Sequence, residues 1–538
     1  MTDERSGTPT ATSTSQIRVY NTMTRSKQPL EPVTPGKVGI YLCGPTVYKP
    51  SHIGHMVGPV IFDVIKRYLT YRGFDVTWVV NITDVDDKLI VESNQRGISI
   101  QALANEMIAD YMTNLAAMGV DTIDHFPKAT DNIDAIIDFI SRLIDKGFAY
   151  AADGDVYFDV GKDSAYGKLS GRSLDSVQGE GGETADRKRS LADFALWKSA
   201  KPGEPSWESP WGPGRPGWHI ECSVMSQQIL GETFDIHGGG LDLVFPHHEN
   251  EVAQSECCHG KPQARYWLHN GLMQAGGETG KVGGRSTRAA DAATEVPAGA
   301  PAEGDAEAQE AGKLGKSKGA APFSELLKKH APETIRFLLL SNHYRRPIYF
   351  SEQRLEEIAA SLETFYRYFK RYERVTGESF YALDAAAGSV TTDNSDETQA
   401  EVSRLRQRFL DAMDDDFNTG AAIGDLFELV RALNKYVDQH ALEAADAPPA
   451  EKLATLQQGT SVLRELASIL GIFRQPVQSA GGGDDALTGE LVALLVKLRA
   501  EARADKNYQL GDRIRDGLQE LGVTLEDRAD GTEWTIQR

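Results

Sequence analysis

The stretch from Lys37 to His55 constrains the fold most, because its pattern changes from strand to helix within a few residues. Residues 37–42 form an apolar run that breaks at Gly44 and Pro45, and apolar residues then recur at helical spacing from about residue 53 to 71. A second apolar run, residues 74–83, follows Gly73. A strand, a helix and a strand at this spacing predict a parallel crossover unit in an α/β sheet.

Two histidines, His52 and His55, flank Gly54 at the predicted N-terminus of this helix. Unpaired backbone N–H groups and the helix dipole attract phosphate at such a position. Imidazoles there can donate hydrogen bonds to phosphoryl oxygens as negative charge develops, and a glycine leaves room for a flat base. From spacing alone, two surface histidines at a helix cap remain an alternative interpretation.

Length and composition predict a soluble protein of two to four domains, because 538 residues exceed what one core supports. No apolar run reaches the length of a membrane span, and the Ser/Thr-rich start has no apolar signal core. We therefore expect a cytoplasmic protein with a disordered start. The formal net charge of -21 is a poor match for RNA binding unless the basic residues are locally clustered.

The four cysteines, Cys43, Cys222, Cys257 and Cys258, form no Cys-x-x-Cys pair, which argues against a disulfide scaffold and a zinc ribbon. His247 and Glu251 are spaced i and i+4 on a predicted helix, so together they supply two metal ligands. Cys43 and Cys222 lie near the ends of predicted core strands and could converge with them. Two buried thiols and an unrelated surface pair on the helix are the alternative.

The residues 52–55 spell the HIGH signature, and the frame around them resembles class I aminoacyl-tRNA synthetases. Cys43, nine residues before His52, narrows the resemblance to the cysteinyl-tRNA synthetase family. The resemblance extends from about residue 17 to the C-terminus with one internal gap. The other segments that resemble this family are Asn81–Lys88, Trp218–Met225, His237–Gly240, His247–Glu251, and Lys313–Ser317, which corresponds to KMSKS with Leu314 and Gly315 as departures.

This resemblance implies a role for individual residues. The implied zinc ligands are Cys43, Cys222, His247 and Glu251; the implied catalytic residues are His52, His55 and Lys316; ATP binding is assigned to His52, Gly54, His55, Lys313, Lys316 and Ser317; and substrate binding is assigned to Trp218 and His237. Cys257 and Cys258 match no ligand position and are expected to be structural. A zinc ion with an open position would prefer a thiolate to a hydroxyl, which separates cysteine from serine without an editing domain.

The implied fold is a class I Rossmann-like parallel sheet with a connective insertion, followed by α-helical and small C-terminal anticodon-binding domains. The predicted boundaries are a disordered start (1–16), the nucleotide fold (17–120 and 218–275), the connective insertion (121–217), a disordered acidic insertion (276–312), the KMSKS-like and stem-contact region (313–350), a helical tRNA-binding domain (351–474), a linker (475–486) and the anticodon-binding domain (487–538). The helical region includes the acidic stretch 413–419. Basic residues on the later helices, among them Arg345, Arg371 and Arg374, are either RNA contacts or a solvated face.

The implied function is ATP-dependent ligation of L-cysteine to tRNA(Cys) through a cysteinyl-adenylate. The implied cofactors are one Zn²⁺ per chain and Mg²⁺ with ATP; the expected partners are tRNA(Cys), ATP and L-cysteine, with no membrane and a monomeric state.

Three alternatives carry a different function. A cysteine ligase that acts on an amino sugar would share the catalytic domain, but the residues after Ser351 favour the tRNA enzyme. A serine hydrolase is suggested by His237–Gly240 and by the G-x-S-x-G pattern at Gly315–Gly319, yet no buried strand precedes the serine. A non-catalytic RNA-binding relative is opposed by the presence of His52, His55 and Lys316.

Overall fold

The computed structural model describes residues 16–173, 185–276, 321–384, 397–444, 447–476, 484–528 and 531–536. Its contacts divide the chain into two units, Met1–Arg474 and Gln475–Arg538. Three predicted features lie largely or wholly outside the described residues: the disordered start, the acidic insertion 276–312 and the KMSKS-like segment. Among the helices that the structure describes, none combines the length and the apolar character needed to cross a membrane.

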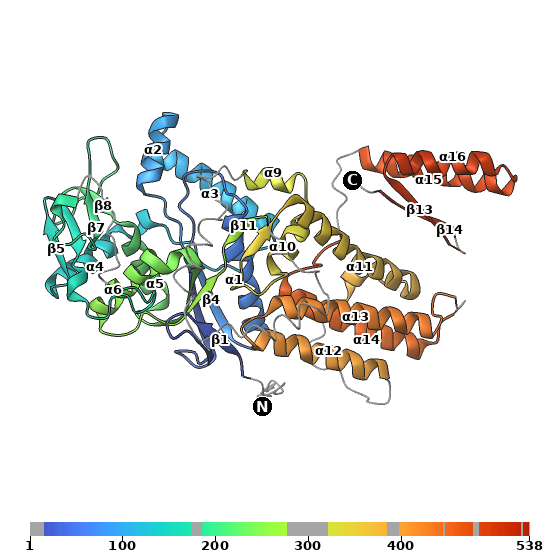
Figure 1. The fold of residues 1–538 in the computed structure, drawn as a ribbon, viewed down its shortest axis with the longest axis horizontal. Coiled ribbons are helices and arrows are strands. Elements are labelled where there is room, and N and C mark those ends of the chain that lie inside the picture. The colour runs from blue at the N-terminus through green and yellow to red at the C-terminus, as the bar shows by residue number, and fades with distance from the viewer. Residues whose placement is uncertain are drawn as a thin grey trace, which may run out of the picture. The chain divides into compact units, whose positions relative to one another are not determined.

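A four-stranded parallel sheet forms the centre of the first unit (Figure 1). Its strands in spatial order are β10 (Ala264–Asn270), β9 (Phe234–Gly240), β3 (Lys37–Leu42) and β4 (Asp75–Val80). Helix α1 (Gly54–Tyr71) joins β3 to its parallel neighbour β4, so the predicted crossover unit is confirmed. Eleven of its residues are buried, which is why its apolar residues recur at helical spacing. Near the N-terminus, the hairpin of β1 (Arg18–Asn21) and β2 (Ser26–Pro29) packs beside β10.

A long insertion separates β4 from β9. It contains α2 (Asp87–Arg96), α3 (Ile100–Ala117), α4 (Ile133–Asp145) and an antiparallel sheet of β5 (Ala149–Ala152), β6 (Asp155–Phe158), β7 (Phe194–Ser199) and β8 (Gly214–Pro216). Strands β5–β7 and α4 supply much of a separate apolar core, whose members include Phe139, Val156 and Trp197. The chain then returns to the parallel sheet through α5 (Trp218–Leu230), and α6 (Glu249–His259) follows β9.

The structure defines the chain more finely between β4 and α3. The strand predicted over 74–83 ends at Val80, and the two helices that follow it, α2 and α3, are separated by residues 97–99. They are separate because Gly97, at φ 66°, ends α2 and the Ser99 side chain caps α3 through the Ala102 N–H. In the turn after β4, Asp84 is buried and accepts hydrogen bonds from both the N–H and the hydroxyl of Thr130.

A helical bundle follows the sheet. The elements in this part are β11 (Met273–Ala275), α9 (Phe323–Leu327), α10 (Pro332–Leu340), β12 (Ile348–Phe350), α11 (Glu352–Thr376), α12 (Glu397–Asp414), α13 (Thr419–Gln439) and α14 (Ala450–Leu470). Strands β11 and β12 pair in parallel. One continuous apolar core runs from β3 and α1 through α10 into the bundle, so the sheet and the bundle fold on each other.

The second unit is small. Helices α15 (Asp484–Ala504) and α16 (Tyr508–Glu520) are followed by an antiparallel hairpin of β13 (Val523–Arg528) and β14 (Gly531–Ile536). The hairpin pairs Glu526 with Glu533. Its core contains Val492, Leu518 and Val523.

Candidate metal centre and nucleotide site

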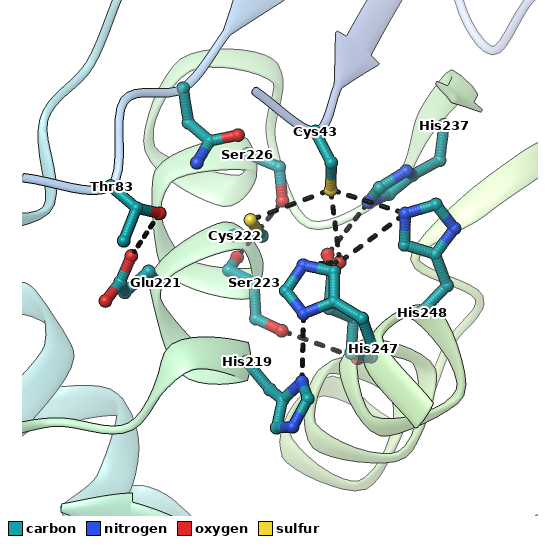
Figure 2. Close-up of polar contacts among 12 residues, drawn as sticks. Cys43, Thr83, His219, Glu221, Cys222, Ser223, Ser226, His237, His247 and His248 are labelled. Carbon is teal, nitrogen blue, oxygen red and sulfur yellow. Dashed lines mark hydrogen bonds and ion pairs between the residues drawn. The ribbon is translucent and has the colours of Figure 1, made fainter. Parts of the chain in front are cut away.

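The four residues predicted to bind zinc lie together at the carboxyl edge of the parallel sheet. Figure 2 labels Cys43, Cys222 and His247. Their ligand atoms are all within 4.8 Å of one another. The Cys43 and Cys222 sulfurs are 3.7 Å apart, the Cys43 sulfur is 3.4 Å from Glu251 Oε1, and His247 Nε2 is 3.1 Å from the same oxygen. We call Cys43, Cys222, His247 and Glu251 the ligand cluster.

The topology of the sheet explains this convergence. Cys43 directly follows β3, whereas Cys222 lies on α5, which precedes β9, and Glu251 lies on α6, which follows β9. Because β3 and β9 are adjacent and parallel, the loops at their carboxyl ends meet, and the Cys43 N–H donates a 3.1 Å hydrogen bond to Gly238 O. The next residue must be Gly44, since a Cβ there would lie 1.8 Å from the Asn81 carbonyl oxygen.

A second layer of histidines supports the ligand cluster. His237 Nε2 lies 2.8 Å from Glu251 Oε2, and the His237 ring stacks on Trp267. His248 Nε2 lies 3.3 Å from the Cys43 sulfur, while its Nδ1 is 2.7 Å from His269 Nε2. Sequence reasoning missed the roles of His248 and His269. The adjacent pair of histidines at 247 and 248 was the available signal for the first, and nothing local marked the second.

This layer also creates an alternative ligand set. Cys43, His237, His248 and Glu251 place their ligand atoms within the same 4.8 Å limit. The two sets share Cys43 and Glu251 and differ in whether the remaining ligands are a thiolate and an imidazole or two imidazoles. Both are compatible with a metal that accepts sulfur, nitrogen and oxygen.

The electrostatics of the ligand cluster favour an ionised carboxylate and one thiolate. Burial opposes charge on Glu251, but His237 and His247 hold the pKa of this carboxyl well below its usual range. Burial also opposes the Cys222 thiolate, yet the hydrogen bond from Cys43 and the nearby His247 lower the pKa of Cys222 to about 6. Burial and the neighbouring His237 lower the pKa of His269 to about 3, so its ring is neutral. The site therefore presents anionic donors in a buried pocket, as a cation site requires.

The residues predicted to contact the amino acid occupy different positions. Trp218, at the start of α5, is 38% exposed and stacks on the His247 ring at a centroid distance of 4.1 Å. His237 is fully buried behind Glu251, so its geometry suits support of a ligand better than direct contact with a substrate. His219 Nδ1 lies 2.9 Å from His247 Nδ1 and orients that ring from the other side.

The two histidines of the predicted nucleotide site stack on each other at a centroid distance of 3.9 Å, beside the start of α1. The Gly54 N–H donates to His52 Nδ1 (3.1 Å), and the His52 N–H donates to His55 Nδ1 (3.2 Å). Because each Nδ1 accepts a hydrogen bond, each neutral ring carries its proton on Nε2. The pair thus offers two N–H donors at a helix N-terminus.

The remaining predicted residues are less informative. Lys313, Lys316 and Ser317 lie outside the described residues. Of the basic residues considered for RNA contacts, Arg345 pairs with Asp416, and Arg371 and Arg374 both pair with Glu443. These three side chains therefore have partners within the protein, which agrees better with charged helix faces than with RNA contacts.

Comparison with known proteins agrees with this geometry. Residues 29–285 match the family model described as the tRNA synthetases class I (C) catalytic domain, and residues 408–474 match the DALR domain. The chain is 43% identical to a cysteine–tRNA ligase of Geobacter metallireducens, over 97% of this chain and 100% of that protein. It is 41% identical to a cysteine–tRNA ligase of Thermococcus onnurineus, over 96% of this chain and 98% of that protein.

A solved structure supports the fold. The structure of Mycobacterium tuberculosis methionyl-tRNA synthetase bound by methionyl-adenylate matches with a TM-score of 0.56 and 14% identity, over 81% of this chain and 90% of that chain. The family match leaves the serine hydrolase interpretation without support, since His237–Gly240 is strand β9 of a synthetase sheet. The chain belongs to the cysteinyl-tRNA synthetase family of class I aminoacyl-tRNA synthetases.

Proposed function

We propose that this protein attaches L-cysteine to tRNA(Cys) with ATP, through a cysteinyl-adenylate intermediate. The observation that carries the proposal is the placement of two functional groups after one strand. The thiol of Cys43 and the histidine pair His52 and His55 both follow β3, so a metal-held thiol and a nucleotide would share the carboxyl edge of the sheet. The relatives named as cysteine–tRNA ligases match nearly the whole chain, which favours the tRNA enzyme over an amino-sugar ligase.

Zinc is the proposed metal of the ligand cluster. Two sulfurs, one imidazole nitrogen and one carboxylate oxygen are a donor set that zinc accepts in tetrahedral geometry. When bound, zinc would supply a Lewis acid that prefers the thiolate of cysteine to the hydroxyl of serine. Neighbouring side chains orient the ligands. His237 orients Glu251, and His247 is oriented by His219 and Trp218.

The proposed adenylation step uses the histidine pair. The amino acid carboxylate attacks the α-phosphorus of ATP and pyrophosphate leaves. The Nε2–H groups of His52 and His55 donate to phosphoryl oxygens as charge develops on them, and Gly54 allows the adenine or ribose to approach the backbone. Mg²⁺ is proposed to accompany ATP by binding its phosphates.

Lys316 is proposed to follow the departing pyrophosphate. Phe323, seven residues after Lys316, donates its N–H to Ser51 O at 2.7 Å, immediately before His52. Seven residues can span up to about 25 Å, so the length of this segment is compatible with a contact between Lys316 and the nucleotide. Lys313 and Ser317 are proposed to contact the nucleotide from the same segment.

The partner tRNA is proposed to bind through the helical region 351–474, which contains the DALR match, and through the C-terminal region 487–538. We also propose the other domain boundaries given above, a monomeric state and a cytoplasmic location.

Amino-acid-dependent pyrophosphate exchange tests the proposed activity. Run with all twenty amino acids, it should respond to cysteine and leave serine at background. Charging of tRNA(Cys) transcripts should follow, with an apparent affinity that falls as salt is added. Protein that passes cysteine to an amino sugar but never to tRNA would overturn the proposal.

Elemental analysis of matched variants tests the metal assignment. His247→Ala should remove zinc, because it deletes a ligand, whereas His248→Ala should keep zinc with weaker affinity. The reverse result would assign the metal to the set that contains His237 and His248.

A further inference from the structure

The acidic stretch 413–419 has no place in the chemistry described so far, yet it makes an unusual set of contacts. It forms the turn between α12 and α13 and contains three consecutive aspartates, which we call the aspartate turn (Asp414, Asp415 and Asp416). All three side chains contact residues outside the bundle. Two of them are buried and the third is exposed.

Asp414 contacts the C-terminal end of α1. It accepts a 2.6 Å hydrogen bond from the Tyr68 hydroxyl and pairs with Arg72. Tyr68 lies on α1 and Arg72 directly follows it, and the other end of this helix carries Gly54 and His55. The bundle is therefore bonded to the same rigid element that presents the proposed nucleotide-binding histidines.

Asp416 has the densest set of partners. It is completely buried, and its carboxylate accepts from the Tyr20 N–H (2.8 Å), the Tyr344 hydroxyl (2.9 Å) and Arg345 Nε (2.7 Å). His343 Nε2 lies 3.4 Å away, and the Asp416 N–H donates to Arg18 O. Asp416 adopts φ 65°, a left-handed conformation that aspartate and asparagine tolerate better than most residues.

The partners of Asp416 lie beside the parallel sheet, which together with its flanking segments we call the catalytic half. Tyr20 lies on β1, which packs beside β10 of the parallel sheet. The segment that contains Tyr344 lies against the end of β10, since Tyr344 O accepts from the Gly271 N–H at 2.8 Å. This segment leads directly into β12, which pairs with β11. The Asp416 carboxylate thus joins the bundle to segments that pack against β10 of the parallel sheet, at whose carboxyl edge the proposed chemistry takes place.

Asp415 provides an internal contrast. Its side chain is 58% exposed and pairs only at the surface, with Lys27 at 2.7 Å. An exposed pair of this kind contributes little to stability or placement. Adjacent residues of identical chemistry therefore differ in whether they reach the interior of the catalytic half.

We propose that Asp414 and Asp416 are positioning residues for aminoacyl transfer, which hold the helical bundle in one orientation on the catalytic sheet so that bound tRNA presents its acceptor end to the adenylate. The inference rests on the proposed function and deepens it. Adenylation needs only ATP, cysteine and the sheet edge, whereas transfer needs the bundle and the sheet in register. A loosened aspartate turn should therefore separate the two activities.

The test is Asp416→Asn, which keeps the side-chain volume and tolerates the left-handed backbone but removes the charge. Cysteine-dependent pyrophosphate exchange should stay within threefold of wild type. The single-turnover rate of transfer from preformed adenylate to tRNA should fall at least tenfold, because the acceptor end is misplaced. Asp415→Asn is the matched control and should change neither rate by more than twofold.

The outcomes separate the inference from its alternatives. A proportional loss of exchange and transfer, with a lowered melting temperature, would mean that Asp416 only stabilises the fold, and unchanged transfer would overturn the inference directly. If Asp416→Asn does not fold, the same comparison is made on Asp414→Asn, which leaves every Asp416 contact in place. Wild-type protein that exchanges pyrophosphate but charges no tRNA would overturn the proposed function, and the inference with it.

Discussion

The ligand cluster and the aspartate turn organise the molecule in opposite ways. The ligand cluster gathers residues from positions 43, 222, 247 and 251 into one site. The aspartate turn consists of three consecutive residues, whose side chains contact α1, the β1–β2 hairpin and the segment before β12. The first arrangement creates a chemical environment, and the second fixes the geometry of large parts. Function in this fold needs both, and they should fail in different ways.

The largest effect is expected when the aspartate turn is removed and the ligand cluster is kept. A chain that ends after Phe350 contains the whole ligand cluster but lacks the aspartate turn and the bundle. Because the apolar core runs continuously from the sheet into the bundle, this chain should lose its cooperative unfolding transition and retain no zinc. Circular dichroism on heating and elemental analysis would measure both. A chain that ends after Arg474, which keeps the whole first unit, should melt cooperatively.

Disrupting the ligand cluster alone should abolish chemistry without unfolding the protein. Loss of an orienting partner commonly costs about 10–100-fold in metal affinity, so loss of a ligand in Cys222→Ser should cost more than that. Cysteine-dependent pyrophosphate exchange should fall by at least about 100-fold. Cys257→Ser is the matched control, because Cys257 lies on α6 outside the cluster. Cys222→Ser protein that holds zinc and still rejects serine would contradict the assignment.

A smaller effect is expected where a buried cation joins the sheet to the bundle. Arg336 on α10 is buried, pairs with Asp63 of α1 and donates to Leu470 O and Met118 O at 3.0 Å each. Arg336→Met removes the Arg336 hydrogen bonds to both carbonyls and leaves Asp63 with Arg67 as its remaining cation, so it should lower the free energy of unfolding by about 3 kcal/mol. Arg474→Met removes an exposed partner of Asp121 and should cost less than about 1 kcal/mol. Denaturant titration would measure both, and equal losses would argue against a special role for Arg336.

The smallest effect concerns the pH dependence of a second buried carboxylate in the bundle. Burial opposes ionisation of Asp416, but His343, Arg345 and the Tyr20 N–H hold its pKa below the usual value. Asp425 on α13 is also buried and pairs with Arg408; here burial outweighs that charge and raises the pKa of Asp425 to about 6. The folded state therefore binds this proton more tightly than the unfolded state, and stability falls as pH rises from about 4 through 6.

Asp425→Asn should remove this fall, which amounts to about 2 kcal/mol between pH 4 and pH 7. Denaturant unfolding at both pH values would measure the difference. Asp411→Asn, at an exposed position on α12, is the control and should leave the wild-type pH dependence intact. A pH dependence that survives in Asp425→Asn would place its origin elsewhere.

Local pattern explains which parts of this structure could be predicted. The crossover around α1 follows from apolar periodicity within a short window of the sequence. The four residues of the ligand cluster could be named from a family pattern, and the structure places them together, although zinc binding stays a prediction. His269 and the partners of Asp416 carried no such signal, because their roles depend on contacts between residues far apart in the chain.

The hydrogen bond between the Tyr20 N–H and Asp416 can form only late in translation, because its partners are separated by 396 residues. At about 5–20 residues per second, a ribosome needs roughly 20–80 seconds to make that intervening chain. Until then β1 lacks its buried acceptor, and apolar residues of α1 such as Tyr68 wait without the bundle that covers them. During this interval the nascent first half therefore has part of its core uncovered, and exposed apolar surface of this kind favours aggregation.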